Sequence, residues 1–86
     1  MNNNLEGGVC ILDKVKPGNY KVVDFMGGYK FKQKLSDMGI YPGTVVKVIS
    51  SAPFGGPVRI IVKGAQYALG RGMASKIYVK KCREHI

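Results

Sequence analysis

The sequence is poor in the residues that most often carry catalysis. It has one histidine, His85, and five carboxylates without paired spacing: Glu6, Asp13, Asp24, Asp37 and Glu84. General acid–base and nucleophilic sites need such groups brought together and tuned by one another. The abundant glycines do not form the G-x-x-x-x-G-K-[ST] pattern of a phosphate-binding loop. We therefore expect that this protein is not an enzyme.

Metal-ligating residues are scarce as well. A transition-metal site takes three or four ligands from Cys, His, Asp or Glu, and the sequence contains no C-x-x-C motif. Cys82 and His85 are three residues apart, and Cys10 joins them only if the two ends of the chain meet. We expect two reduced thiols and no cofactor. The alternative is a divalent transition metal on Cys10, Cys82 and His85.

Long apolar runs are also missing. The longest, such as Ile60-Ile61-Val62, are far shorter than the roughly 20 residues that span a bilayer. The opening Met1-Asn2-Asn3-Asn4 is polar and does not resemble a signal sequence. Small secreted domains usually carry more cysteines than the two found here. We expect a cytoplasmic protein that does not insert into the membrane.

Positive charge, by contrast, is plentiful. Fourteen Lys and Arg against five Asp and Glu give a formal net charge of +9. Such a surface favours an acidic partner, which could be nucleic acid, anionic lipid headgroups or an acidic protein face. Nucleic-acid readers usually combine arginine forks with exposed aromatic residues. Because Arg59, Arg71 and Arg83 are scattered, a basic barrel that binds nucleic acid is the less favoured alternative.

Segments that favour strands alternate with glycine-rich turns along most of the chain. Strand composition is strongest in residues 19–25, 44–50, 58–63 and 77–80, with a further short strand at 66–69. The glycines that we assign to turns are Gly18, Gly39, Gly43, Gly55, Gly56 and Gly64.

One helix interrupts the strands. Between residues 29 and 38 the apolar side chains of Phe31, Leu35 and Met38 fall at i, i+4 and i+7, which stacks them on one helical face towards the core. Gly39 then ends the helix. Residues 71–75 favour a short helical turn.

The order of these elements predicts a mainly β domain over residues 9–81, between a flexible leader (1–8) and a polar tail (82–86). Short strands at this spacing favour a small closed barrel, because closure removes exposed sheet edges. An SH3-like β-barrel with one inserted helix is the best fit, and a five-stranded OB-type barrel is the nearest alternative.

An ordered set of residues resembles the FeoA family, ferrous iron transport protein A. The segment Lys34-Leu35-Ser36-Asp37-Met38-Gly39-Ile40-Tyr41-Pro42-Gly43 is similar to the family pattern RLxxLGIxPG. The resemblance covers roughly residues 9–80 and includes Pro17-Gly18, Pro53-Phe54-Gly55-Gly56-Pro57, Gly64, Ala68-Leu69, Ala74, Ile77 and Val79. Lys34 replaces the usual arginine, which keeps the charge but removes the bidentate fork. Met38 replaces the usual leucine with a more adaptable apolar side chain.

The resemblance implies an SH3-like domain, which also occurs at the C-terminus of diphtheria-toxin-repressor-type regulators. It further implies a cytoplasmic accessory protein of bacterial ferrous iron uptake. The implied partner is the FeoB membrane transporter, which carries a cytosolic G-domain. A stand-alone regulatory domain that binds a transition metal is the alternative from the repressor relatives.

For the partner site we predict a groove lined by Tyr41, Phe54 and Met73 and rimmed by Lys30 and Lys34. Pro42 and Arg71 are expected beside it, because the helix-to-strand corner and the hairpin tip offer exposed apolar groups there. The alternative is that these residues only shape the turns.

Overall fold

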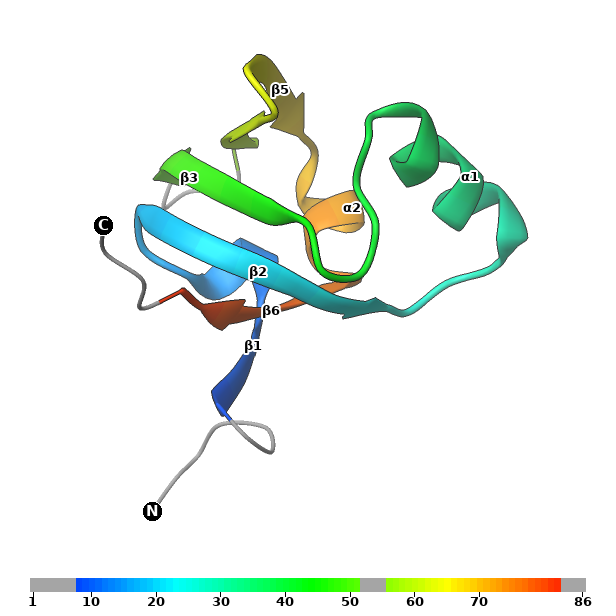
Figure 1. Ribbon diagram of the computed structural model, residues 1–86, viewed down its shortest axis with the longest axis horizontal. Helices are drawn as coiled ribbons and strands as arrows, with labels where there is room; N and C mark the ends of the chain where they lie inside the picture. Colours follow the sequence, from blue (N-terminus) through cyan, green and yellow to red (C-terminus); the bar gives the residue numbers. More distant parts are fainter. Residues whose placement is uncertain (1–7, 52–55, 83–86) are drawn as a thin grey trace.

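The protein is described by a computed structural model, which covers residues 8–51 and 56–82. In this part of the chain, six strands form one antiparallel sheet in the order β1-β6-β2-β3-β4-β5 (Figure 1). The strands are β1 (Val9–Ile11), β2 (Gly18–Phe25), β3 (Val45–Ser51), β4 (Val58–Val62), β5 (Ala65–Leu69) and β6 (Ile77–Lys81). The helical elements are the 3-10 turn η2 (Leu12–Lys14), α1 (Tyr29–Asp37) and α2 (Arg71–Ala74).

The mainly β architecture with one inserted helix confirms the sequence prediction, and both helices lie where the pattern placed them. Residues 9–11, which appear in the sequence only as an apolar run, form β1 and pair with β6. The predicted leader, apart from Gly8, the hairpin tip with Phe54 and Gly55, and the tail beyond Cys82 lie outside the described residues.

The core is made by the inward-facing side of a strongly bent sheet. Along β4, Val58, Ile60 and Val62 are buried while Arg59 is exposed, which is the period-2 alternation of a sheet with one solvated face. The sheet bends at two register shifts, between Val22 and Asp24 in β2 and between Val48 and Ser50 in β3. The core residues are Leu12, Val15, Tyr20, Val22, Leu35, Ile40, Val46, Val48, Val58, Ile60, Val62, Leu69, Ala74, Ile77 and Val79.

Tyr20 brings a polar atom into this core. Its hydroxyl donates a hydrogen bond of 2.7 Å to the backbone carbonyl oxygen of Lys16, so the buried phenol is satisfied. Burial raises the pKa of Tyr20, and the nearby Cys10 thiol acts in the same direction.

Helix α1 ends in a Schellman motif, as the glycine signal predicts. The backbone N–H of Gly39 donates to the carbonyl of Ser36 at 2.9 Å, and that of Ile40 donates to Leu35 at 2.9 Å. Gly39 adopts φ +82°, which a residue with a Cβ reaches only with strain. The motif turns the chain so that Ile40 enters the core directly after the helix.

Helix α2 is tied into the body of the protein by the side chain of its first residue. Arg71 Nε donates to the carbonyl oxygen of Gly56 at 3.0 Å, and its Nη1 donates to the carbonyl oxygen of Asp13 at 3.0 Å. These bonds join three segments that are distant in sequence: η2, the approach to β4, and α2 itself. Within the helix, Ala74 is fully buried.

None of the helices within residues 8–51 and 56–82 combines the length and the apolar character that a membrane crossing requires.

Candidate protein-interaction site

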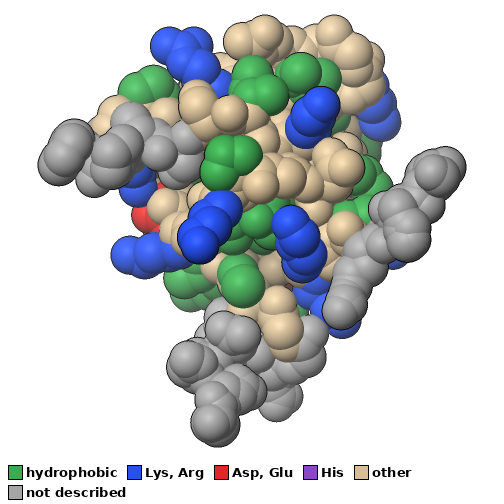
Figure 2. All heavy atoms as spheres, turned by 90° about the vertical axis from the view of Figure 1, so that its left-hand side faces the viewer, with side chains coloured by type: hydrophobic (Ala, Val, Ile, Leu, Met, Phe, Trp, Pro, Cys, Tyr) green, Lys and Arg blue, Asp and Glu red, His purple; other side chains and the backbone are tan. Residues whose placement is uncertain are grey.

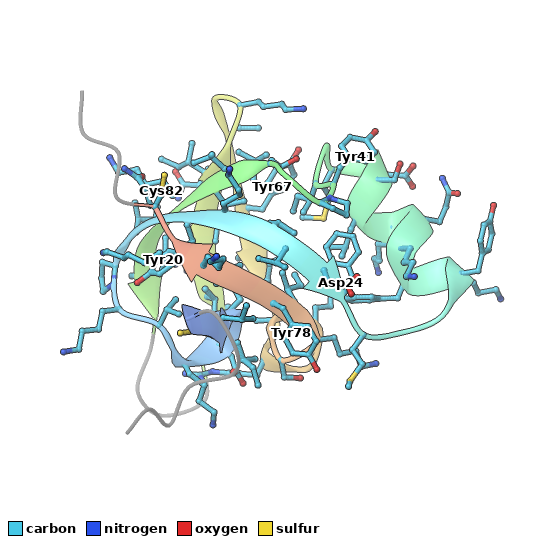
Figure 3. All side chains as sticks on the ribbon, turned by 60° about the horizontal axis from the view of Figure 1, so that its bottom comes forward. Tyr20, Asp24, Tyr41, Tyr67, Tyr78 and Cys82 are labelled. Atoms are coloured by element: carbon cyan, nitrogen blue, oxygen red, sulfur yellow. The ribbon has the colours of Figure 1, made fainter. Side chains whose placement is uncertain are left out.

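An open groove of about 390 Å³ lies where the end of β2, helix α1 and the turn after the helix come together. Figure 3 shows Tyr41 and Asp24 beside α1, whereas Tyr20 and Cys82 lie towards the other end of the molecule. The wall of the groove is largely apolar. We use the word groove for this set of residues: Asp24, Phe25, Tyr29, Lys32, Gln33, Ser36, Tyr41 and Pro42.

The backbone around Tyr41 is fixed by hydrogen bonds to β2. The N–H of Gly43 donates to the carbonyl of Val22 at 2.7 Å, and the N–H of Val22 donates to the carbonyl of Thr44 at 2.8 Å. The Thr44 hydroxyl oxygen accepts a bond of 3.0 Å from the N–H of Tyr41. Gly43 has φ +99°, so glycine is the residue that this tight turn favours. The base of Tyr41 is therefore held rigidly.

The ring of Tyr41 is exposed but contacts two neighbouring residues, Lys63 and Ser36. It is 48% exposed, and Lys63 Nζ lies 5.6 Å from its centroid, within cation–π range. Its hydroxyl lies 3.4 Å from the carbonyl oxygen of Ser36 in α1. An aromatic ring that is already oriented loses little conformational entropy on binding, which favours Tyr and Trp as anchors in interfaces.

Two phenylalanines support the other wall of the groove. Phe25, at the end of β2, meets Phe31 edge to face with ring centroids 6.3 Å apart. The Gly27–Gly28 link between strand and helix allows this contact, because a Cβ on Gly27 would lie 2.9 Å from a ring carbon of Phe31. Tyr29, the first residue of α1, is 78% exposed at the rim.

Asp24 and Lys32 are the charged residues in the lining. One carboxylate oxygen of Asp24 accepts a bond of 2.8 Å from the N–H of Phe25, which fixes the side chain locally. The groove therefore offers one anionic and one cationic group beside aromatic surface. Such a combination of aromatic surface and polar groups is common in protein interfaces.

The described part of the chain contains no group of side chains that could hold a metal ion. Within residues 8–51 and 56–82, no three side chains of His, Cys, Asp or Glu come close enough to hold a metal ion. His85 lies outside these residues, so the alternative site on Cys10, Cys82 and His85 stays a prediction.

Both cysteines are half-buried thiols outside any disulfide. Cys10 stands opposite Val79 in the β1–β6 pair, while the backbone N–H of Cys82 donates to the carbonyl of Asn19. The first and last strands do pair, but their register does not put the two cysteines opposite each other.

The structure distributes the predicted partner-site residues over more than one place. Tyr41 and Pro42 line the groove, whereas Lys30 and Lys34 are exposed on α1 but are not part of its lining. Met73 is half-buried and packs against the core, and Arg71 serves as the tether described above. The partner site remains a prediction, and of the residues predicted for it only Tyr41 and Pro42 line the groove.

Sequence reasoning did not assign six of the lining residues to the site: Asp24, Phe25, Tyr29, Lys32, Gln33 and Ser36. Asp24 and Phe25 read as the end of an ordinary strand. The Gly27–Gly28 pair could have predicted their position. A short link with two glycines places the end of the strand beside the start of the helix.

Known proteins resemble this chain in sequence and in fold. Residues 10–81 match the family described as FeoA domain. A candidate Fe(2+) transport protein A of Methanocaldococcus jannaschii is 48% identical over 48 residues, which is 56% of each chain. The aligned part thus spans little more than half the length of that relative.

The solved structures agree with this assignment. The crystal structure of an iron uptake regulatory protein (FeoA) superimposes with a TM-score of 0.79 at 39% identity, covering 86% of this chain and 99% of that one. A manganese-dependent transcriptional repressor gives a TM-score of 0.78 at 17% identity, covering 86% of this chain and 42% of the repressor. This second likeness concerns the fold alone. Together these structures confirm the predicted SH3-like fold, including its occurrence within a larger metal-dependent repressor.

Proposed function

This chain belongs to the FeoA domain family, and from that premise we propose that it is a non-catalytic accessory protein of ferrous iron uptake. It acts in the cytoplasm by binding the FeoB-type membrane transporter on its cytosolic side. The names of its relatives support iron uptake as the process: one is an iron uptake regulatory protein and another is a candidate Fe(2+) transport protein.

The observation that carries the proposal is the preorganised, exposed ring of Tyr41 at the wall of an apolar groove. Exposed aromatic residues on a rigid backbone are typical centres of protein interfaces. Asp24 and Lys32 supply polar contacts of both signs beside the ring, which would set the register of a bound segment.

The direct test is capture of the detergent-solubilised transporter by the immobilised full chain, comparing wild type with Tyr41→Ala. Loss of a central aromatic anchor should weaken binding by about thirtyfold, since such residues contribute on the order of 2 kcal/mol or more. Tyr41→Phe keeps the ring and should bind within about threefold of wild type.

Val45→Ala is the matched control, because Val45 is 46% exposed but does not line the groove. It should leave capture unchanged. Retention of full affinity by Tyr41→Ala, or an equal loss with Val45→Ala, would remove the groove as the partner site.

A further inference from the structure

Three lysines form a row across the outer face of the sheet, away from the groove lining. Lys21 of β2 stands directly opposite Lys80 of β6 in the register. On its other side Lys21 stands opposite Val45 of β3, and Lys47 follows Val45 by two residues on the same face. All three lysines are exposed. We call Lys80, Lys21 and Lys47 the lysine row.

The arrangement of the lysine row opposes sheet stability. Like charges directly opposite each other on neighbouring strands are destabilising. None of the three forms an ion pair with a carboxylate in residues 8–51 or 56–82. Asp24 lies further along β2, where one of its carboxylate oxygens accepts a bond from the N–H of Phe25. Within the described residues no ion pair offsets this repulsion, and an external anion would relieve it.

Apolar side chains accompany the row. Val45, opposite Lys21, is 46% exposed, and Val23, two residues along β2, is 37% exposed. The face thus presents lysines around aliphatic groups. Figure 2 shows one end of the molecule, where Lys and Arg side chains are interspersed with apolar ones and few acidic side chains are visible.

We propose that the lysine row docks this protein onto the anionic surface of a lipid bilayer. A row of lysines near a bilayer is attracted to the negative headgroups, and exposed valines can enter the interfacial layer. This contact is peripheral, and no segment of the chain crosses the bilayer in it. It goes beyond the proposed function, because it requires neither the groove nor the transporter.

The chemistry of the row favours lipid over nucleic acid. The row contains no arginine, and Tyr78, beside it on β6, is half-buried with its hydroxyl 3.5 Å from the sulfur of Met26. Base recognition relies on arginine forks and on exposed aromatic rings for stacking. Mobile lipid headgroups need only point charges, and lysine supplies these.

The test is flotation of the full chain with vesicles at about 150 mM salt, near physiological screening. Vesicles of phosphatidylcholine alone are compared with vesicles containing about a quarter phosphatidylglycerol as the anionic lipid. Binding should require the anionic lipid, and Lys21→Glu should lower the partition coefficient at least about tenfold.

The matched control is Lys30→Glu on α1. Both variants lower the formal charge from +9 to +7, because a negative group replaces a positive one. Each also gains an attractive neighbour, since Lys21→Glu faces Lys80 and Lys30→Glu stands four residues before Lys34. Neither should unfold, which far-UV circular dichroism would verify, and Lys30→Glu should change partitioning by less than about threefold.

Three results would overturn the proposal. The first is absence of binding to anionic vesicles above the phosphatidylcholine background. The second is an equal loss with both variants, which would mean diffuse charge rather than this row. The third is tighter binding to a short DNA duplex at the same salt that Lys21→Glu abolishes, which would identify nucleic acid as the occupant. None of these results depends on capture of the transporter, so the two proposals fail separately.

Discussion

Helices α1 and α2 differ in what their side chains contact: those of α2 pack into the protein, whereas most of those of α1 face solvent. The short helix α2 buries Ala74 completely and sends Arg71 across the body to the carbonyl oxygens of Asp13 and Gly56. The longer helix α1 buries only Leu35 completely among its residues and leaves Tyr29 at its start 78% exposed. The length of a helix in this protein therefore does not indicate how much it contributes to the core. The four-residue helix helps to close the core, and the nine-residue helix presents a surface.

The difference follows from the composition of the helices. Three of the nine residues of α1, Lys30, Lys32 and Lys34, are lysines, which leaves a narrow apolar stripe to face the sheet. In helix α2 the fully buried residue is the small Ala74, which allows the helix to pack closely on the core. Substitutions that loosen one helix should therefore act differently from those that loosen the other.

The largest effect is expected where α1 depends on one side chain. Leu35→Ala removes the only fully buried residue of that helix and should lower the free energy of unfolding by about 3 kcal/mol, from lost burial and the cavity left behind. Urea denaturation followed by circular dichroism measures this. A loss below about 1 kcal/mol would mean that the sheet does not need α1 for its stability.

A somewhat smaller effect is expected from cutting the tether of α2. Arg71→Met keeps much of the apolar stem but leaves two part-buried carbonyl oxygens without their donor, which should cost about 2 kcal/mol. Arg59→Met is the control on the solvated face of β4, where a change within about 0.5 kcal/mol is expected. Equal effects in the same denaturation assay would show that Arg71 contributes only as a surface charge.

The smallest of the three effects tests the end of α1. Gly39→Ala places a Cβ at φ +82° and should destabilise by about 1 kcal/mol, through strain rather than a clash. Gly70→Ala is the matched change before α2, where φ is −63° and no atom lies within 4 Å of the new Cβ. It should be neutral or slightly stabilising. If both variants melt at the same temperature, the Schellman turn is not strained by alanine.

Much of the fold could be predicted because local and global signals agree. The alternation of Val58, Ile60 and Val62 predicts which face of β4 is buried, and Gly39 marks the end of α1. The pairing of β1 with β6 was harder to foresee. The three apolar residues 9–11 carry no register information until their partners in β6, 67 or more residues away, supply it.

The candidate site was predictable only in part, for the same reason. Tyr41 and Pro42 stand out in a turn motif, so their exposure could be expected. Phe25 joins them only because the chain turns at Gly27–Gly28 and brings α1 next to the end of β2. Arg71 was predicted beside the partner site, and no local pattern indicated the two hydrogen bonds that its guanidinium donates to the carbonyl oxygens of Gly56 and Asp13.

The order of strands in the sheet has a consequence for how the protein is made. Strand β6 lies between β1 and β2, although it is the last strand in sequence. During synthesis β2 to β5 can pair with their sequence neighbours, but β1 has no native partner until residues 77–81 leave the ribosome. Such long-range closure slows folding and leaves strand edges open meanwhile. Until the five residues of β6 are available, the edges of β1 and β2 that pair with β6 stay open.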